Sequence, residues 1–179
     1  MTQTTNQAWL IEGAVKDSQT ITARWSPAGM RLIDDVSVHE VLNVPKNTGY
    51  LTEVFRADWL RGANVTIDQV FQVVLEAGAI SAWHAHERTL DRIFVNRGLV
   101  RVVLYDARED SPTRGRVNEF RFGTVRPALV VVPNQVWHGI QNLASTQSSV
   151  LNLVDRAYDY GDPDHWRLPV DTPHIPFTF

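Results

Sequence analysis

Short runs of β-branched and aromatic residues, separated by turn residues, fill the chain from residue 65 onward. The clearest runs are "VTIDQVFQVVL" (65–75), "LVRVVLYD" (99–106), "ALVVV" (128–132) and "SSVLNLV" (148–154). Such residues favour strands, and frequent turn signals between short strands are typical of sandwiches and barrels. No stretch of ~10 or more residues has the periodicity of a helix. The sequence therefore predicts an all-β fold, and a closed one, because closure leaves few strand edges exposed.

Shorter runs predict the remaining strands and the division of the chain. Further strands are expected at 20–25, 30–33, 36–42, 49–55, 80–86, 91–95 and 117–122. The segments "NVPKNT" (43–48) and "RLPVDTPHIPF" (167–177) are expected to be irregular, and residues 58–64 to hold one helical turn. We expect residues 1–29 to form an extension with a possible β-hairpin, and residues 30–179 to form one domain.

Composition excludes several classes of protein. The chain has 179 residues and a formal net charge of −3, and it shows no dense stripe of Lys and Arg, so nucleic acid is not an expected partner. It has no cysteine, which removes disulfides and thiolate chemistry. No segment reads as a signal peptide or approaches the ~20 apolar residues of a membrane span. We expect no membrane partner and a cytoplasmic location.

Two of the six histidines, His84 and His86, stand one residue apart in the strand-like stretch "AISAWHAH" (79–86). Residues i and i+2 of a strand point to the same face, so the two imidazoles project together and Trp83 projects the other way. Apolar strands flank the pair, which predicts that both rings point into the barrel. The alternative is a pair of buried histidines that bond only to backbone carbonyls.

The spacing around this pair extends into two motifs that resemble those of the cupin superfamily. The first comprises Gly78, His84, His86, Asp91 and Gly98, and the second comprises Pro133, His138 and Asn142. Asp91 stands where the first motif has glutamate, and Gln135 where the second has glycine. The shorter carboxylate reaches less far, and the loss of glycine is expected to change the loop before His138. The resemblance implies a cupin-type jelly-roll β-barrel or sandwich with few short helices.

Longer stretches resemble one branch of that superfamily, the dTDP-4-dehydrorhamnose 3,5-epimerase-like proteins. They are "GYLTEVFR" (49–56), "ISAWHAH" (80–86), "VVLYDAREDSPTRGRVNEF" (102–120), "PNQVWHGIQNL" (133–143) and "AYDYGDPDHWRLPVDTPHIPF" (157–177). The resemblance implies an isomerase that acts on a nucleotide-linked 4-keto-6-deoxy sugar. Such an enzyme removes a proton alpha to the ketone and returns one on the opposite face, and this chemistry requires no cofactor.

The same resemblance implies roles for individual residues. His84 is the expected base, Asp171 the carboxylate that orients it, and Tyr158 the best candidate for the acid. Glu53 and Arg56 are expected to help bind the nucleotide, and His138 to face the pocket as a hydrogen-bond partner of the substrate. The resemblance also implies a homodimer formed by strand exchange.

Three positions depart from the epimerase pattern. Asp91 stands in place of a cationic lysine, and Thr48 and Ser81 stand in place of arginines expected to contact the diphosphate. Asp91 also allows a different prediction, because His84, His86, Asp91 and His138 form a three-histidine, one-carboxylate set suited to a divalent ion such as Fe, Mn, Ni or Zn. A metal-bound His84 could not serve as the free base, so the two roles compete.

Three functions therefore remain open on the sequence alone. The leading one is a carbohydrate epimerase, and the second is a metal-dependent cupin enzyme of another class, such as a dioxygenase. The third is a barrel that binds a sugar nucleotide without turning it over. We expect the remaining histidines to lie on the surface or in the tail; these are His39, His165 and His174.

Overall fold

The computed structural model describes residues 9–23, 27–60 and 65–179, and it divides the chain into two compact units, Met1–Arg31 and Leu32–Phe179. In the first unit, Ile21 and Pro27 form an isolated antiparallel bridge, and the Ala28 amide donates to the Thr20 carbonyl at 2.9 Å. Part of the expected hairpin, residues 24–26, lies outside the described residues. Residues 30–33 form no strand, so the predicted return strand is wrong.

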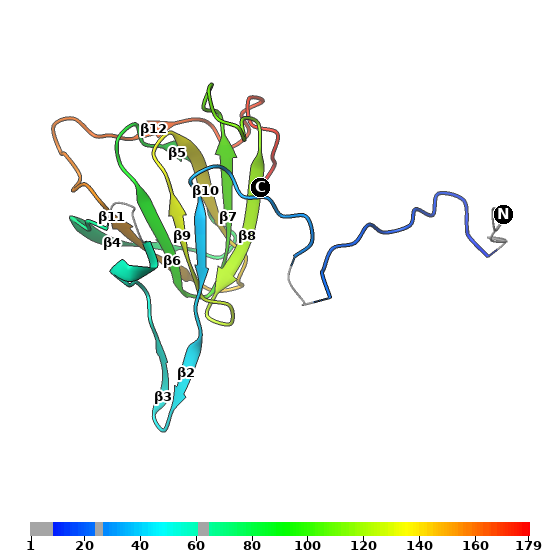
Figure 1. Cartoon of the computed structure of the whole chain (residues 1–179), viewed down its shortest axis with the longest axis horizontal. Coiled ribbons are helices and arrows are strands. Elements are labelled where there is room, and N and C mark those ends of the chain that lie inside the picture. Colours follow the sequence, from blue (N-terminus) through cyan, green and yellow to red (C-terminus); the bar gives the residue numbers. More distant parts are fainter. Residues whose placement is uncertain (1–8, 24–26, 61–64) are drawn as a thin grey trace. The chain divides into compact units, whose positions relative to one another are not determined.

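The regular secondary structure of the second unit is almost entirely antiparallel β-structure (Figure 1). Its strands are β1 (Ser37–Glu40), β2 (Asn43–Lys46), β3 (Gly49–Thr52), β4 (Gln69–Leu75), β5 (Ile80–Ala85), β6 (Asp91–Arg97), β7 (Leu99–Asp106), β8 (Val117–Gly123), β9 (Ala128–Val132), β10 (Val136–Asn142), β11 (Ser148–Val154) and β12 (Trp166–Arg167). Among the described residues, the helical structure is one 3₁₀ turn, Ala57–Leu60. No helix in this described part is long and apolar enough to cross a bilayer. The prediction of an all-β, cupin-type fold is confirmed.

Two five-stranded sheets form the body of this unit. One has the strand order β1-β9-β6-β11-β4, and the other has the order β12-β5-β10-β7-β8. Alternate residues of each strand point between the sheets, as the pleat requires. Val102 and Leu104 of β7 thus join the main core together with Val130 of β9 and Val150 of β11. The strands are held in this sandwich by apolar side chains from both sheets.

The opposite faces of the two sheets are covered by segments that are not part of either sheet. Trp83 of β5 and Val103 of β7 pack outward against Ile175, Phe177 and Phe179 of the C-terminal segment. On the other sheet, Phe94, Leu129 and Leu153 pack against apolar residues of the 54–67 region that include Phe55 and Trp59. The C-terminal segment therefore covers the outer face of the sheet that carries the histidine pair.

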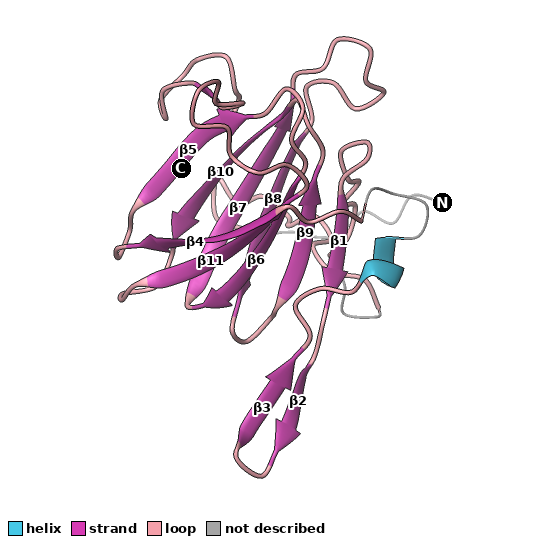
Figure 2. Ribbon diagram, turned by 90° about the vertical axis from the view of Figure 1, so that its left-hand side faces the viewer, coloured by secondary structure: helices cyan, strands magenta, loops and turns pink. Residues whose placement is uncertain are grey.

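Strands β2 and β3 form a two-stranded ribbon that extends beyond the ends of the two sheets (Figure 2). The prediction of an irregular 43–48 segment is wrong, because β2 occupies Asn43–Lys46. Pro45 is tolerated there because this ribbon has free edges, where a missing N–H leaves no gap in a ladder. Val44, Tyr50 and Leu51 are exposed on the ribbon.

Candidate active site

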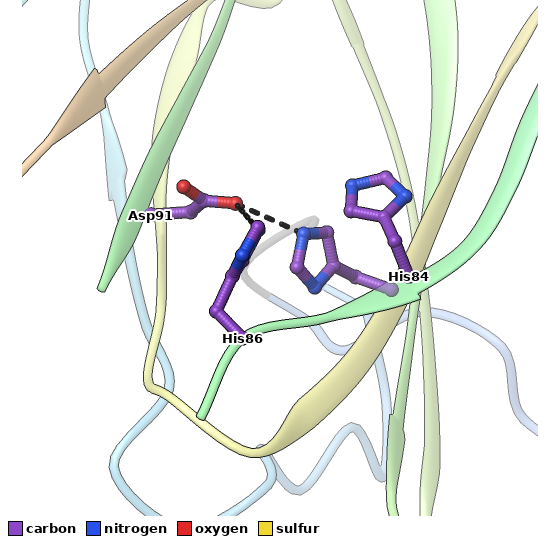
Figure 3. A group of neighbouring side chains, drawn as sticks. His84, His86 and Asp91 are labelled. Atoms are coloured by element: carbon purple, nitrogen blue, oxygen red, sulfur yellow. Dashed lines mark hydrogen bonds and ion pairs between the residues drawn. The ribbon is translucent and has the colours of Figure 1, made fainter. Parts of the chain in front are cut away.

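Strands of both sheets bring three histidines and one carboxylate together between the sheets. His84 lies on β5, His86 directly follows it, Asp91 begins β6, and His138 lies on β10 directly opposite His84. Trp83 packs on the outer face of the sheet, so the alternation of the strand turns His84 inward. Figure 3 shows the side chains of His84, His86 and Asp91 facing a common space. One nitrogen or oxygen from each of the four residues lies within 4.8 Å of all the others.

Asp91 connects two of the three rings. Its Oδ2 lies 3.0 Å from Nε2 of His138 and 3.3 Å from Nε2 of His86. The sequence suggested that aspartate would reach less far than glutamate, yet this carboxylate contacts both rings. Burial alone would raise the pKa of Asp91, but hydrogen bonds from His138 and His86 outweigh burial and hold it well below its usual value. Asp91 is therefore an ionised carboxylate in a buried setting.

Backbone carbonyls fix the orientation of the same two rings. Nδ1 of His138 lies 3.0 Å from the carbonyl oxygen of Val136, and Nδ1 of His86 contacts the carbonyl oxygen of Asp164. A carbonyl only accepts hydrogen bonds, so Nδ1 carries a proton in both rings. Each ring consequently turns Nε2 toward Asp91.

His84 differs from the other two rings. Its Nδ1 is buried and has no hydrogen-bond partner, although its ring centroid lies only 4.1 Å from that of His138. Burial, and next the neighbouring His138, lower the pKa of His84 well below its usual value. His84 is therefore a neutral imidazole at neutral pH.

The expected pair between His84 and Asp171 does not form in the structure. Asp171 is exposed, whereas the next residue, Thr172, is buried. The exposed Asp171 side chain is therefore not packed against the buried Nδ1 of His84. No carboxylate from the described C-terminal segment reaches Nδ1 of His84.

Three of the four residues, His84, His86 and Asp91, line a cavity of about 320 Å³ that opens between the sheets. The buried His138 is not among the lining residues, so the structure does not place it facing this cavity as the sequence predicts. The cavity is also lined by Tyr158, which is 48% exposed.

Three arginines also line this cavity, and sequence reasoning did not single them out: Arg88, Arg156 and Arg167. Four aspartates line it as well: Asp91, Asp159, Asp162 and Asp164. The cavity thus combines a neutral imidazole, a phenol and charged groups of both signs.

His165 was expected to be a surface or tail histidine, and this prediction is wrong. Its ring lies 5.2 Å from that of His84 and 5.0 Å from that of His86, and its buried Nε2 has no partner. Burial, and next the charge of Arg167, lower the pKa of His165 to about 4. The signal that could have found it is its position within the tail segment that resembles the epimerases.

Asp164 holds this tail segment against the end of β5. Its carboxylate accepts hydrogen bonds from the backbone amides of Glu87, Arg88 and Thr89 and from the Thr89 hydroxyl. Burial would raise the pKa of Asp164, but these bonds lower it to about 2. The next residues, β12, pair with β5 opposite Ala85 and His84.

Glu53 and Arg56, the expected nucleotide contacts, lie outside this cavity. Arg56 donates to Glu53 at 3.1 Å and to Asp58 at 2.9 Å, and its side chain remains 50% exposed. The structure therefore brings His84, His86, Asp91, His138 and Tyr158 together and leaves Glu53, Arg56 and Asp171 apart from them.

Gln135 adopts a backbone conformation that favours glycine. Its φ of 64° lies in the left-handed region, and its amide donates to the His86 carbonyl at 2.6 Å. The expectation that this replacement changes the loop before His138 stays a prediction. The loop connects the start of β10 to His86.

Several known proteins are similar to this chain in sequence or in fold. The family model described as dTDP-4-dehydrorhamnose 3,5-epimerase matches residues 31–175. A probable low-salt glycan biosynthesis epimerase of Haloferax volcanii is 34% identical over 78% of this chain and 89% of its own, and a spore coat polysaccharide biosynthesis protein of Bacillus subtilis is 31% identical over 83% and 97%. A dTDP sugar isomerase of Desulfovibrio desulfuricans has a crystal structure that superposes with a TM-score of 0.73 at 28% identity, covering 82% of this chain and 91% of the other. The chain belongs to the dTDP-4-dehydrorhamnose 3,5-epimerase family.

Proposed function

We propose that this protein epimerises a nucleotide-linked 4-keto-6-deoxy sugar, with His84 as the base. The observation that carries the proposal is the state of His84: a neutral ring with an unpartnered Nδ1 that lines the cavity between the sheets. A neutral imidazole can accept a proton, whereas a protonated one cannot. Membership of an epimerase family supplies the reaction class.

The chemistry follows from the acidity of carbons next to a ketone. His84 takes the proton from such a carbon, and the electron pair of the broken C–H bond moves into an enolate whose negative charge rests on the ketone oxygen. Tyr158, on the loop that lines the cavity, then returns a proton to the other face of the carbon. Inversion results because removal and return take place on opposite faces.

The arginines of the cavity take the role of the phosphate-binding residues that this chain lacks. Thr48 and Ser81 stand where the family has arginines, and neither side chain can neutralise a diphosphate. Arg88, Arg156 and Arg167 line the same cavity as His84. Guanidinium groups bind phosphate oxygens in a bidentate manner, so we assign the diphosphate to this side of the cavity.

Exchange of substrate protons with deuterated water tests the proposed base. With a dTDP-4-keto-6-deoxyhexose as substrate, the wild-type protein is expected to incorporate deuterium next to the ketone, as read by mass spectrometry and NMR. The His84→Gln variant should lose this exchange by ~10²–10⁴-fold, the contribution usual for a general base. A matched control is Arg121→Gln on β8, whose side chain is 59% exposed, and it should exchange like the wild type. Exchange that persists in His84→Gln would reject His84 as the base.

The acid can be tested separately. If Tyr158 supplies the returning proton, Tyr158→Phe should still exchange deuterium at the carbon that His84 deprotonates, but with retention of configuration. Loss of inversion together with surviving exchange is therefore the expected result. Normal inversion in this variant would assign the acid to another residue.

We also propose that the protein is a cytoplasmic homodimer. Its cysteine-free composition suits a reducing compartment. The exposed apolar residues Val44, Tyr50 and Leu51 on the β2–β3 ribbon suit burial against a second copy. Light scattering should report a dimer for the wild type and a monomer for Leu51→Asp, whereas a monomeric wild type would contradict the proposal.

A further inference from the structure

We propose that Arg167 is a catalytic residue of the epimerisation, whose guanidinium binds the ketone oxygen of the sugar and stabilises the enolate. This inference rests on the proposed function and deepens it, because it assigns one of the three cavity arginines to the reacting sugar. The other two, Arg88 and Arg156, remain for the diphosphate. Arg167 thereby supplies the positive charge that the chain lacks at Asp91, where the family has a lysine.

The strand register places Arg167 directly beside the proposed base. Arg167 of β12 pairs with His84 of β5, and side chains that stand opposite each other in antiparallel strands share one face, with Cβ atoms ~4.5–5.5 Å apart. Trp166 pairs with Ala85, which shares the outer face with Trp83. Arg167 therefore points inward, and it lines the same cavity as His84. Because an arginine side chain is longer than that of histidine, its guanidinium can extend past the imidazole to a bound sugar.

Arg167 differs from the other two cavity arginines in its partners. Arg88 pairs with Asp162 at 3.6 Å, and Nε of Arg156 donates to the carbonyl oxygen of Arg88 at 3.2 Å. Among the residues that the structure describes, none accepts a hydrogen bond from the guanidinium of Arg167 or forms an ion pair with it. A guanidinium carries five N–H donors, so those of Arg167 are available to a ligand in the cavity.

The ionised carboxylate in the site makes a cation beside His84 necessary. Asp91 already places a negative charge between the sheets, where its side chain is only 5% exposed. Enolate formation adds a second negative charge to a setting that screens charge poorly. A guanidinium offsets the new charge, and it stays protonated throughout the reaction. Donors aimed at a developing oxyanion usually contribute the largest single share of catalysis.

Backbone hydrogen bonds on both sides of Arg167 fix its position before substrate binds. On one side, Leu168 and Trp83 exchange two backbone hydrogen bonds of 3.1 Å. On the other side, the Asp164 carboxylate accepts hydrogen bonds from the amides of Glu87 and Arg88. A donor that is already in place requires no reorganisation at the moment of reaction. Strand β12 therefore holds the cation next to the base, although it is only two residues long.

The step that Arg167 assists balances without a cofactor. His84 takes the proton from the carbon next to the ketone, and the electron pair of the C–H bond forms a carbon–carbon double bond. The π electrons of the carbonyl move onto its oxygen, which accepts hydrogen bonds from Arg167. When the carbon receives a proton on its other face, these electrons return and the ketone forms again. Arg167 neither gains nor loses a proton.

Separate measurements of turnover and binding test this role. Turnover is the kcat of deuterium exchange with a dTDP-4-keto-6-deoxyhexose at saturating concentration, and binding is the calorimetric Kd of dTDP, which has no ketone. Arg167→Gln is expected to lower kcat by ~10²–10³-fold, the loss usual for one oxyanion donor, and to leave the Kd of dTDP nearly unchanged. Arg88→Gln should do the converse, with a higher Kd and most of kcat retained. Arg121→Gln, whose side chain is 59% exposed on β8, should match the wild type in both.

A second variant keeps the test independent of how well Arg167→Gln folds. Arg167→Lys retains the charge without the planar fork, so its kcat should lie between those of the wild type and Arg167→Gln. Normal dTDP binding by either variant also shows that it is folded. A wild-type kcat in Arg167→Gln, or a higher Kd of dTDP with kcat retained, would overturn the inference and leave the epimerase standing. Wild-type protein that binds dTDP but exchanges no substrate protons would instead refute the proposed function, and this inference with it.

Discussion

Replacement of Asp164 by alanine is predicted to release the segment that closes the cavity. The four hydrogen bonds accepted by this carboxylate are 2.7–3.0 Å long, and all join the 157–165 loop to residues that follow β5. The amides of Glu87 and Arg88 belong to exposed residues and can bind water once the carboxylate is gone. Thr89 is 9% exposed, so its amide and hydroxyl lose most of their hydrogen bonding.

The stability that Asp164→Ala loses can be worked out from these differences in exposure. A hydrogen bond to a charged group contributes about 1.5–3 kcal/mol when its donor cannot be resolvated, and much less when water replaces the acceptor. The two Thr89 bonds thus dominate, and the whole substitution should lower the free energy of unfolding by about 3–4 kcal/mol. In a protein of this size, 1 kcal/mol shifts the Tm by ~2–4 °C, so Tm should fall by roughly 10 °C.

Thermal unfolding followed by circular dichroism measures this shift. Asp162→Ala is the matched control, because Asp162 lies on the same loop with its side chain 84% exposed and pairs with Arg88 at 3.6 Å. Exposed pairs contribute at most about 1 kcal/mol, so this variant should melt within ~2–4 °C of the wild type. If Asp164→Ala melts no lower than Asp162→Ala, the loop is not held by this carboxylate and the reasoning is wrong.

Three further predictions concern stability. Burial would raise the pKa of Asp106, but hydrogen bonds from Arg108, Ser111 and Thr113 outweigh it and hold the pKa well below its usual value. The ionised Asp106 therefore stabilises the folded state fully above the unfolded pKa of about 3.9, and this stabilisation is lost as the pH falls below that value. Between pH 6 and pH 3, the free energy of unfolding measured in urea should fall by about 1 kcal/mol more in the wild type than in Asp106→Asn. Gly139→Ala places a Cβ 2.4 Å from Cβ of Ala82 and should cost about 1–3 kcal/mol of unfolding free energy; an unchanged Tm would show that β5 and β10 can separate there. Gln135→Gly relieves a φ of 64° and should raise the unfolding free energy by up to about 1 kcal/mol in a urea titration, whereas a lower value would mean that the glutamine side chain stabilises the loop.

The alternation of side chains along strands and the content of β-branched residues were sufficient to predict most strands of the sandwich. The runs that became β7, β9 and β11 carry enough apolar residues to fill both the core and an outer cluster. Strand β10 was not predicted from its own composition, because His138, Gly139 and Gln141 interrupt its apolar residues. It forms because it pairs with β7 along its length and with β5 on its other side, and such long-range pairing overrides local propensity.

The part of the site that lies on strands could be predicted from the sequence. The fixed spacing of His84 and His86, and the motif position of His138, predicted three side chains that the structure places together. Asp171 and His165 lie in a segment without regular structure, where spacing gives no direction to a side chain. In that segment, the direction of a side chain depends on contacts such as those of Asp164, which joins residues about eighty positions apart in the sequence.

The position of β5 has a consequence for synthesis of the chain. Both strands that flank it, β10 and β12, come later in the sequence. At ~5–20 residues per second, a ribosome needs roughly 3–10 s after β5 before β10 exists. During that interval the nascent chain presents a strand with Trp83 on one side, two histidines on the other, and both edges open to mispairing. Slow translation or scarce chaperones should therefore lower the yield of active protein without changing the stability of the molecules that have folded.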